Sequence, residues 1–270
     1  MLVPVEAALW KNGVPAERAE QILHLLRQSG FVTIEQIRSQ LSVSLATVRR
    51  DLQHLETAGL VRRTRGGAIQ PEPLLYQPFL HDSSFQEQLE RHAAEKRRIA
   101  LAAAEQVRDG ETITLTAGTT TTEVVRSLRS RRDLKVVTNA VNIAMELGRQ
   151  KQWDVFLTGG QMRGEWFSLA GPDAIRTMGR FFVDIAFIGV NGIDPDQGLT
   201  CFNSDEAALI ATMVDRAKRR VVVADHSKLS VVATHRICPV ESVHLLITDT
   251  VASEEAVTLY IQRGIEVRRV

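Results

Sequence analysis

The sequence predicts an α/β fold in two parts, an amino-terminal winged helix-turn-helix and a larger carboxy-terminal α/β domain. Three observations lead to this prediction. The chain of 270 residues is longer than most single domains. Its first 70 residues contain three helical patterns followed by a short strand pair. After residue 86, apolar runs alternate with helical patterns, which is typical of parallel strands joined by crossover helices.

The composition argues against a disordered or coiled-coil protein, because 44% of the residues are hydrophobic and 24% are charged. No apolar run approaches the roughly 18 residues of a membrane helix, and residues 1–8 carry no export signal. Cys201 and Cys238 lie far apart and outside any metal-ligand spacing. We therefore expect a cytoplasmic protein without a metal, a cofactor or a membrane partner.

Charge and proline content divide the chain. Residues 1–70 hold nine Lys and Arg against six Asp and Glu, whereas residues 71–270 hold 24 against 26. The basic first part is weak evidence for a polyanionic partner. Three of the eight prolines fall in Pro71–Phe85. The sequence thus predicts a first domain at 1–70, a linker at 71–86 and a second domain at 87–270.

The first two helices are predicted from their apolar spacing and their end signals. Ala16–Ser29 places apolar residues on one face, between a first-turn proline and a closing glycine. A second helix begins after the capping box formed by Thr33 and Gln36 and runs to about Leu41.

A third helix begins after Ser44, and its buried stripe is Val48, Leu52 and Leu55 at i, i+4 and i+7. The opposite face carries small, hydroxyl and basic residues. Small residues in the first turn let a helix enter the major groove, where Arg and Gln reach base edges or phosphates. We expect the following strip to contact double-stranded DNA: Ser44, Ala46, Thr47, Arg49, Arg50, Gln53 and His54.

Residues 60–69 have the pattern of a strand, a basic glycine turn and a second strand. Such a wing would bring Arg63 and Arg65 to the phosphate backbone or the minor groove. A structural three-helix bundle with a solvated basic face is the simpler alternative. Any one of these arginines, taken alone, is more simply explained as a solvated surface residue. The combination of small first-turn residues, paired arginines and a basic hairpin favours DNA binding instead.

These residues resemble the DeoR family of bacterial sugar-catabolism repressors. The resemblance is carried by Val43–Leu52, with its Arg-Arg-Asp-Leu segment, and by Gly59–Ala68, which ends in Gly-Gly-Ala. It covers about residues 16–250. The resemblance implies that four residues lie on the recognition helix: Ser44, Thr47, Arg49 and Arg50.

A single helix is predicted over Glu87–Val107, and its basic cluster of Lys96, Arg97 and Arg98 is interpreted as a solvated face. Six apolar runs that follow are predicted strands: Thr112–Thr116, Lys135–Thr138, Asp154–Thr158, Asp184–Val190, Arg220–Asp225 and His244–Thr248.

The turn after the first of these strands contains Gly118 followed by Thr119, Thr120 and Thr121. Glycine lets the backbone approach a ligand closely, and amides and hydroxyls at a helix start suit a phosphate. A threonine-rich helix cap explains this loop equally well when the loop is taken alone. The Walker and dinucleotide-binding spacings are both absent from the sequence.

Other predicted strands end in small or polar residues, at the edge where open α/β sheets bind ligands. Lys228 is a candidate counter-charge for a phosphate, and Glu206 is a candidate acceptor for sugar hydroxyls. The candidate effector-binding residues are Thr116, Gly118, Thr119, Thr120, Thr121, Asn139, Gly160, Asn191, Gly192, Glu206 and Lys228.

The family resemblance continues through the second domain and implies a sugar-phosphate sensor similar in fold to ribose-5-phosphate isomerase. Its matching segments include Ala117–Thr121, Gly189–Ile193 and Ser227–Lys228. The resemblance implies a phosphate on the threonine loop and three residues near the sugar: Asn139, Glu206 and Lys228. Many family members have an acidic residue where this chain has Thr116. This difference bears on which hydroxyl groups of the sugar the protein recognises.

The favoured function is a repressor of a carbohydrate operon that binds operator DNA and responds to a phosphorylated sugar or sugar acid. Palindromic operators are read by symmetric proteins, so we expect a homodimer or homotetramer. The alternative is a sugar-phosphate isomerase or hydrolase with an appended DNA-binding domain, for which Glu206 and Asp205 are candidate bases. Thr116 stands where an acid would be needed, so we expect no enzyme and no catalytic residue. Activation in place of repression stays open from the residues alone.

Overall fold

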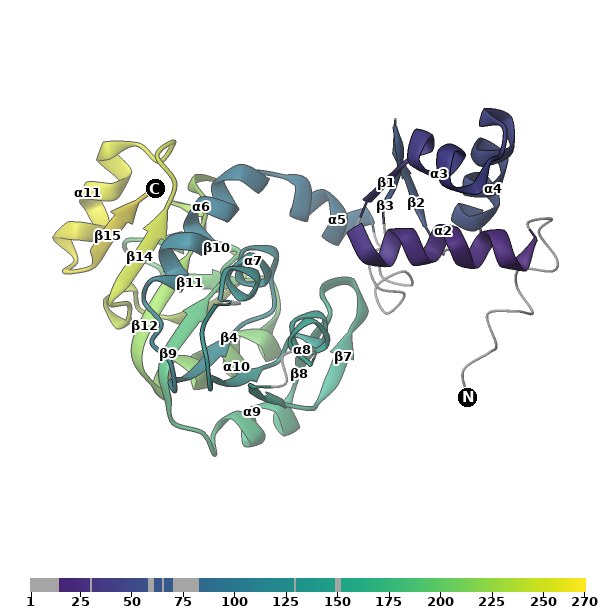
Figure 1. Ribbon diagram of the computed structural model, residues 1–270. Coiled ribbons are helices and arrows are strands. Elements are labelled where there is room, and N and C mark those ends of the chain that lie inside the picture. Colours follow the sequence, from purple (N-terminus) through teal and green to yellow (C-terminus); the bar gives the residue numbers. More distant parts are fainter. Residues whose placement is uncertain are drawn as a thin grey trace. The chain divides into compact units, whose positions relative to one another are not determined.

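The computed structural model describes residues 15–29, 31–57, 61–64, 66–69, 83–128, 130–148 and 152–270 (Figure 1). The chain divides into two compact units, residues 1–81 and 82–270. Among the described residues, the first unit has one hydrophobic core cluster, and the second has two. None of the described helices is long and apolar enough to cross a membrane.

The described part of the first unit is a winged helix-turn-helix, as predicted (Figure 1). Its helices are α2 (Ala16–Ser29), α3 (Ile34–Leu41) and α4 (Leu45–Thr57). Its strands are β1 (Phe31–Thr33), β2 (Arg62–Thr64) and β3 (Gly67–Ile69), which form an antiparallel sheet in the order β1-β3-β2. Strand β1 was not predicted.

Side-chain caps fix the starts of α3 and α4. The Thr33 hydroxyl accepts a hydrogen bond from the Gln36 amide at 3.0 Å, and the Gln36 side chain accepts one from the Thr33 amide at 2.8 Å. This reciprocal pair confirms the predicted capping box. At the start of α4, the Ser44 hydroxyl accepts a hydrogen bond from the Thr47 amide at 3.1 Å.

The core of the first unit follows the predicted helical stripe. Val48, Leu52 and Leu55 of α4 are buried and pack with Ile37 of α3. Gly67 begins β3, and a Cβ atom there would lie 1.9 Å from the Val32 carbonyl oxygen of β1. The close approach of β1 and β3 therefore requires glycine at this position.

The second unit is built on a seven-stranded parallel sheet with the order β15-β14-β12-β9-β4-β5-β6. The strands are β4 (Thr112–Leu115), β5 (Lys135–Thr138), β6 (Asp154–Leu157), β9 (Val183–Ile188), β12 (Ala217–Val223), β14 (Leu245–Thr248) and β15 (Glu266–Arg269). All six predicted strands are present, with small shifts at their ends. From the adjacent strands β4 and β9, the chain adds strands in opposite directions, which creates a topological switch point.

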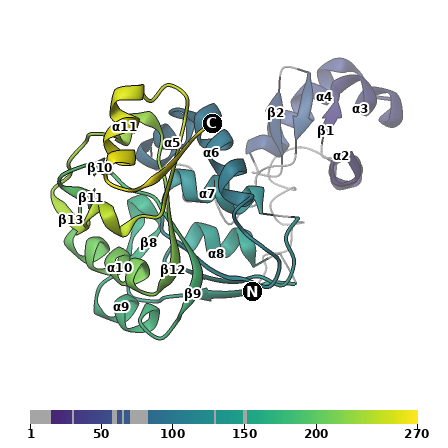
Figure 2. The ribbon, with the colours of Figure 1, turned by 90° about the vertical axis from the view of Figure 1, so that its left-hand side faces the viewer.

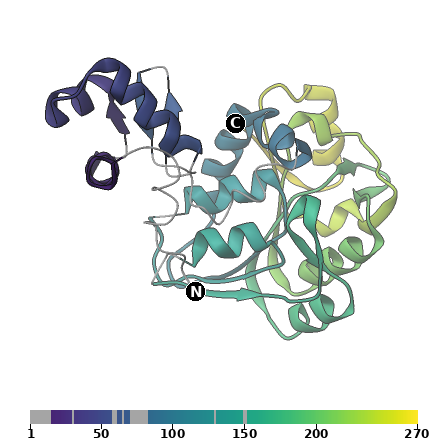
Figure 3. The ribbon, with the colours of Figure 1, turned by 90° about the vertical axis from the view of Figure 1, so that its right-hand side faces the viewer.

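Helices cover both faces of this sheet, which confirms the predicted α/β class (Figures 2 and 3). On one face, α6 (Ala93–Ala104), α7 (Thr119–Ser127) and α8 (Val141–Leu147) bury one core cluster. On the other face, α9 (Pro172–Met178), α10 (Ser204–Asp215) and α11 (Glu254–Gln262) bury the second.

Two smaller sheets flank the main one, and neither was predicted. A hairpin of β7 (Gln161–Arg163) and β8 (Ser168–Ala170) encloses the short helix η2 (Gly164–Trp166). A second antiparallel sheet consists of β10 (Gly192–Asp194), β11 (Gly198–Cys201) and β13 (His235–Cys238). Short helices η3 (His226–Lys228) and η4 (Val240–Ser242) complete the described elements.

The prediction of one helix over Glu87–Val107 is wrong, because α5 (Ser83–Glu90) and α6 are separate helices. The chain breaks at His92, whose φ of 54° lies in the left-handed region that a right-handed helix of L-residues excludes. Helix α5 also begins inside the segment predicted as a linker. It is anchored by Phe85, which is buried and packs edge-on against Phe167 with ring centroids 5.0 Å apart.

Candidate functional site

The predicted DNA-reading strip runs along helix α4 and the turn before it. Ser44 and Ala46 are exposed, and the hydroxyls of Ser44 and Thr47 lie 2.8 Å apart. Arg49 and Arg50 are exposed on the following turn. The strip therefore presents small residues and hydroxyls first and two cations after them, as an element that enters a DNA groove would.

Asp51, the next residue, has a different role. Its carboxylate is buried and accepts two hydrogen bonds from Arg18, from Nε at 2.5 Å and from Nη2 at 3.0 Å. This bidentate ion pair joins α2 to α4 across the core. Since Asp51 is paired inside the unit, it leaves the positive charges of Arg49 and Arg50 facing solvent.

The last residues of the strip differ in accessibility. Gln53 is exposed, whereas His54 is half-buried. The Nδ1 atom of His54 is buried and has no hydrogen-bond partner among the described residues. One ring nitrogen of His54 is thus not available to DNA.

The wing is connected to helix α4 through Glu56. The Glu56 carboxylate accepts a hydrogen bond from the Arg63 amide at 2.8 Å, and its other oxygen lies 3.9 Å from Arg63 Nη1. Arg62 is exposed on the same strand, although it was not among the predicted contacts. Arg65 lies outside the described residues.

The second unit contains a cavity of about 270 Å³, near the lower end of the size range of small-molecule sites. It lies at the carboxyl ends of β4, β5, β9 and β12, where polar residues were predicted to converge. Eight of the predicted effector-binding residues line it: Gly118, Thr119, Thr120, Thr121, Asn139, Asn191, Glu206 and Lys228.

The threonine loop forms one wall of the cavity and leads directly into helix α7. The hydroxyls of Thr121 and Thr122 donate hydrogen bonds to the Gly118 carbonyl oxygen at 2.9 and 2.7 Å. These two contacts hold the loop in a fixed conformation. The first amides of α7 lack helical partners, so the wall presents backbone donors at the positive end of a helix.

Asn139 supports this loop from the neighbouring strand. Its Oδ1 atom accepts a hydrogen bond from the Ala117 amide at 3.0 Å, and its Nδ2 atom donates one to the Leu169 carbonyl at 3.0 Å. The side chain is buried, and both of its polar atoms are engaged with backbone groups. Asn139 thus links the threonine loop to the β7–β8 hairpin.

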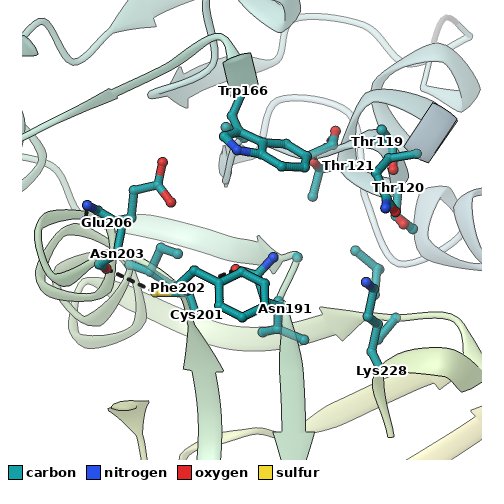
Figure 4. A pocket seen from close by; sticks show the side chains of 18 of the residues that line it. Thr119, Thr120, Thr121, Trp166, Asn191, Cys201, Phe202, Asn203, Glu206 and Lys228 are labelled. Carbon is teal, nitrogen blue, oxygen red and sulfur yellow. Dashed lines mark hydrogen bonds between the residues drawn. The ribbon is translucent and has the colours of Figure 1, made fainter. Parts of the chain in front are cut away.

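The opposite end of the cavity carries a carboxylate (Figure 4). Glu206 Oε1 accepts a hydrogen bond from the Ser168 hydroxyl at 2.5 Å and lies 3.6 Å from Arg163 Nε. Asn203 caps α10 by accepting hydrogen bonds from the Asp205 and Glu206 amides, which fixes where Glu206 begins the helix. Of the two candidate bases for an isomerase, Glu206 lines the cavity, and Asp205 does not.

Two lysines line the cavity, and Figure 4 shows Lys228 on the same side as Thr119 to Thr121, away from Glu206. The second is Lys96, whose interpretation as part of a solvated face is wrong. It is only 3% exposed, whereas Arg97 and Arg98 beside it are exposed. Burial lowers the pKa of the Lys96 ammonium to about 8, although Asp225 opposes this shift.

Three residues predicted to bind the effector do not line the cavity. Thr116 is buried, and its hydroxyl accepts a hydrogen bond from the Gly189 amide at 2.9 Å, so it joins β4 to the end of β9. A Cβ atom at Gly160 would lie 2.5 Å from the Ala170 carbonyl oxygen. At Gly192 it would lie 2.2 Å from the Val231 carbonyl oxygen. Both glycines therefore allow close backbone packing.

Sequence reasoning missed several lining residues, among them Gln88, Lys96, Arg163, Trp166, Phe202 and Asp225. Most of them lie on α5, α6 or the short β7–β8 hairpin, none of which was predicted with its correct bounds. Lys96 had a usable signal, because it falls on the same helical face as Ile99, Ala100 and Ala103. Among the described residues, no group of three His, Cys, Asp or Glu side chains is placed to hold a metal ion.

Two family models match the chain. The DeoR-like helix-turn-helix domain matches residues 18–73, and the DeoR C terminal sensor domain matches residues 91–250.

Curated relatives match along most of their length. The chain is 34% identical to the HTH-type transcriptional repressor GlcR of Bacillus subtilis, over 93% of this chain and 94% of the relative. It is 30% identical to the glycerol-3-phosphate regulon repressor of Escherichia coli K12, over 86% and 90% of the two chains. Among solved structures, ribose 5 phosphate isomerase A from Neisseria gonorrhoeae matches with a TM-score of 0.38 and 16% identity, covering 57% of this chain and 56% of the other.

Proposed function

The chain belongs to the DeoR family of DNA-binding transcription regulators, and we propose that it represses a carbohydrate-catabolism operon. In this proposal the first unit binds operator DNA, and a phosphorylated sugar or sugar acid binds the cavity of the second unit. The observation that carries the proposal is that the threonine loop at the start of α7 and two lysines line the same cavity. Cytoplasmic localisation follows from the need to reach DNA.

The proposed DNA contacts lie on helix α4, on the turn before it and on the wing. Small residues at the helix start are compatible with entry into the major groove, and the two arginines that follow reach bases or phosphates. The proposed set is Ser44, Ala46, Thr47, Arg49, Arg50, Gln53, His54, Arg63 and Arg65. Arg62 is added to this set because it is exposed on strand β2.

The proposed effector has an anionic group at one end and hydroxyls at the other. The anion is assigned to the end with Lys228, where helix α7 contributes the positive end of its dipole. Hydroxyls are assigned to the end with Glu206, whose Oε1 atom accepts the Ser168 hydroxyl and whose Oε2 atom has no hydrogen bond to another described residue. Asn191 lines the same cavity, and its Oδ1 atom accepts a hydrogen bond from the Phe202 amide at 3.2 Å.

Release of repression requires that the effector bind two conformations of the protein with different affinities. An effector releases DNA only when it binds the conformation with low DNA affinity more tightly than the conformation with high DNA affinity. We propose a homodimer or homotetramer as the functional assembly, because a palindromic operator offers two equivalent half-sites.

A thermal-shift screen of the full chain tests the effector class. Phosphorylated sugars and sugar acids are compared with their neutral parent sugars, since only a ligand that binds the native state raises the melting temperature. The proposal requires at least one anionic sugar to stabilise the protein in a saturable manner while its neutral parent has no effect. Stabilisation by neutral sugars alone would contradict it.

A further inference from the structure

Lys96 is a buried cation to which neither the family resemblance nor the proposed function gives a specific role. It lies on α6, is 3% exposed, and lines the cavity. An ammonium group has three donors. In the described part of the chain it makes one hydrogen bond, to the backbone carbonyl oxygen of Gln88. Two of its donors are therefore available to a molecule in the cavity.

The charges around Lys96 indicate what kind of molecule this is. Asp225 and Glu123 attract the ammonium, whereas Lys228 and Arg91 repel it. None of the ion pairs formed within the described residues includes Lys96, and Glu123 is paired with Arg126 instead. Burying a cation without a paired anion is unfavourable. An anion that binds between Lys96 and Lys228 would offset the free-energy cost of burying the unpaired ammonium group.

Building on the proposed function, we propose that Lys96 is a second ligand-binding cation, that the ligand is a phosphate monoester, and that Lys96 links the bound phosphate to helix α5. Two ammonium groups and a helix start outweigh the Asp225 carboxylate, which already accepts hydrogen bonds from the Ser227 amide and hydroxyl. They suit the two negative charges of a phosphate monoester better than the single charge of a sugar carboxylate. This selects the phosphorylated sugar over the sugar acid.

The link to α5 follows from the position of Gln88. This residue lies in the last turn of α5, where carbonyl groups lack helical partners and a cation is favourable. A second contact joins α5 to the cavity wall, because Phe85 packs on Phe167, the neighbour of the lining residue Trp166. Helix α5 is also the first described element after residues 71–82. A ligand held by Lys96 therefore acts on the segment that leads to the DNA-binding unit.

The first test uses inorganic phosphate as the probe and the full chain with Lys96→Met. Methionine preserves the length of the side chain and removes its charge and donors. We expect phosphate affinity, measured by thermal shift at constant ionic strength, to fall about 10- to 100-fold, as expected for a lost charged hydrogen bond. Arg97→Met is the matched control, because Arg97 is the exposed neighbour of Lys96. Equal phosphate affinity in the two variants would overturn the role of Lys96.

The second test needs no variant. Hydrogen exchange of the α5 amides, residues 83–90, is measured in the wild-type chain with and without phosphate. We expect phosphate to slow this exchange, because a bound phosphate holds the Lys96 ammonium in its contact with Gln88. Unchanged or faster exchange at saturating phosphate would overturn the link to α5.

The outcomes separate this inference from the proposed function. If gluconate, a sugar carboxylate, stabilises the wild-type chain and phosphate and glucose 6-phosphate do not, the phosphate assignment is wrong while the proposed function survives. If no anionic sugar in the thermal-shift screen stabilises the chain, the proposed function fails, and this inference fails with it.

Discussion

Replacing Asp51 with Ala should destabilise the first unit strongly, although the residue lies beside the arginines proposed to contact DNA. The Asp51 carboxylate is 2% exposed and accepts two hydrogen bonds from the Arg18 guanidinium. Alanine removes both acceptors and leaves the guanidinium facing a space that the carboxylate filled. The ion pair connects α2 to α4, so its loss weakens the packing on which the position of α4 depends.

The magnitude follows from the burial of the two partners. Removing one member of a fully buried ion pair costs about 3–5 kcal/mol. The Arg18 side chain is 25% exposed, so water reaches part of it, and we expect about 2–3 kcal/mol. The exposed pair of Glu35 and Arg38 provides the control, with side chains 67% and 50% exposed. Glu35→Ala should cost no more than about 0.5 kcal/mol.

Native-state hydrogen exchange of the α4 amides in the full chain measures the free energy of opening for each variant. We expect the opening free energy to fall for Asp51→Ala and to stay near the wild-type value for Glu35→Ala. Opening free energies that agree within about 0.5 kcal/mol for the two variants would mean that the buried ion pair is no stronger than a surface ion pair, contrary to this prediction.

Three further predictions concern DNA and ligand binding. Arg50→Ala should weaken DNA binding by about 1–3 kcal/mol in a gel-shift titration and leave α4 hydrogen exchange unchanged; unaltered DNA affinity would remove Arg50 from the proposed contacts. Lys228→Ala should keep wild-type DNA affinity and lose the response to a sugar phosphate that releases the wild type; release at the wild-type ligand concentration would exclude Lys228 from the phosphate site. Phosphate affinity should fall above pH 8, because the Lys96 ammonium has a pKa of about 8 and only its protonated form attracts the anion. The Lys96→Met variant should lack this fall between pH 7 and 9, and calorimetric titrations that show the same pH profile for both proteins would contradict the assignment.

The elements that the sequence predicted well are those with a strong periodic or apolar pattern. The stripe of Val48, Leu52 and Leu55 identified α4, and its buried face is as expected. The inner strands β9 and β14 of the main sheet are buried along nearly their whole length, so they are continuous apolar runs that stand out in the sequence.

The elements that were missed are short and depend on tertiary contacts. Strand β1 and the hairpin strands β7 and β8 have three residues each, too few to establish a period of two. Strand β1 exists because Gly67 lets β3 approach it closely. The break between α5 and α6 occurs at His92, a residue with no strong preference for ending a helix.

The cavity was predicted in outline because the carboxyl ends of parallel strands meet at one edge of the sheet. This rule brought together Thr119 and Lys228, which are more than one hundred residues apart in the sequence. It gave no information on Lys96, which comes from a helix. Its neighbours Arg97 and Arg98 made it look like part of a surface cluster, although successive helical residues point about 100° apart.

In the proposed mechanism, a sugar phosphate bound in the second unit controls the DNA affinity of the first. A DNA duplex is first selected from a random pool by its binding to the protein. The most direct measurement is then the fluorescence anisotropy of this labelled duplex as the full chain is added, with and without ligand. The ligand is the sugar phosphate that most raises the melting temperature. We predict that saturating ligand weakens DNA binding by about 5- to 150-fold, the usual range of allosteric coupling. The same DNA affinity with and without saturating ligand would show that ligand binding and DNA binding are not coupled.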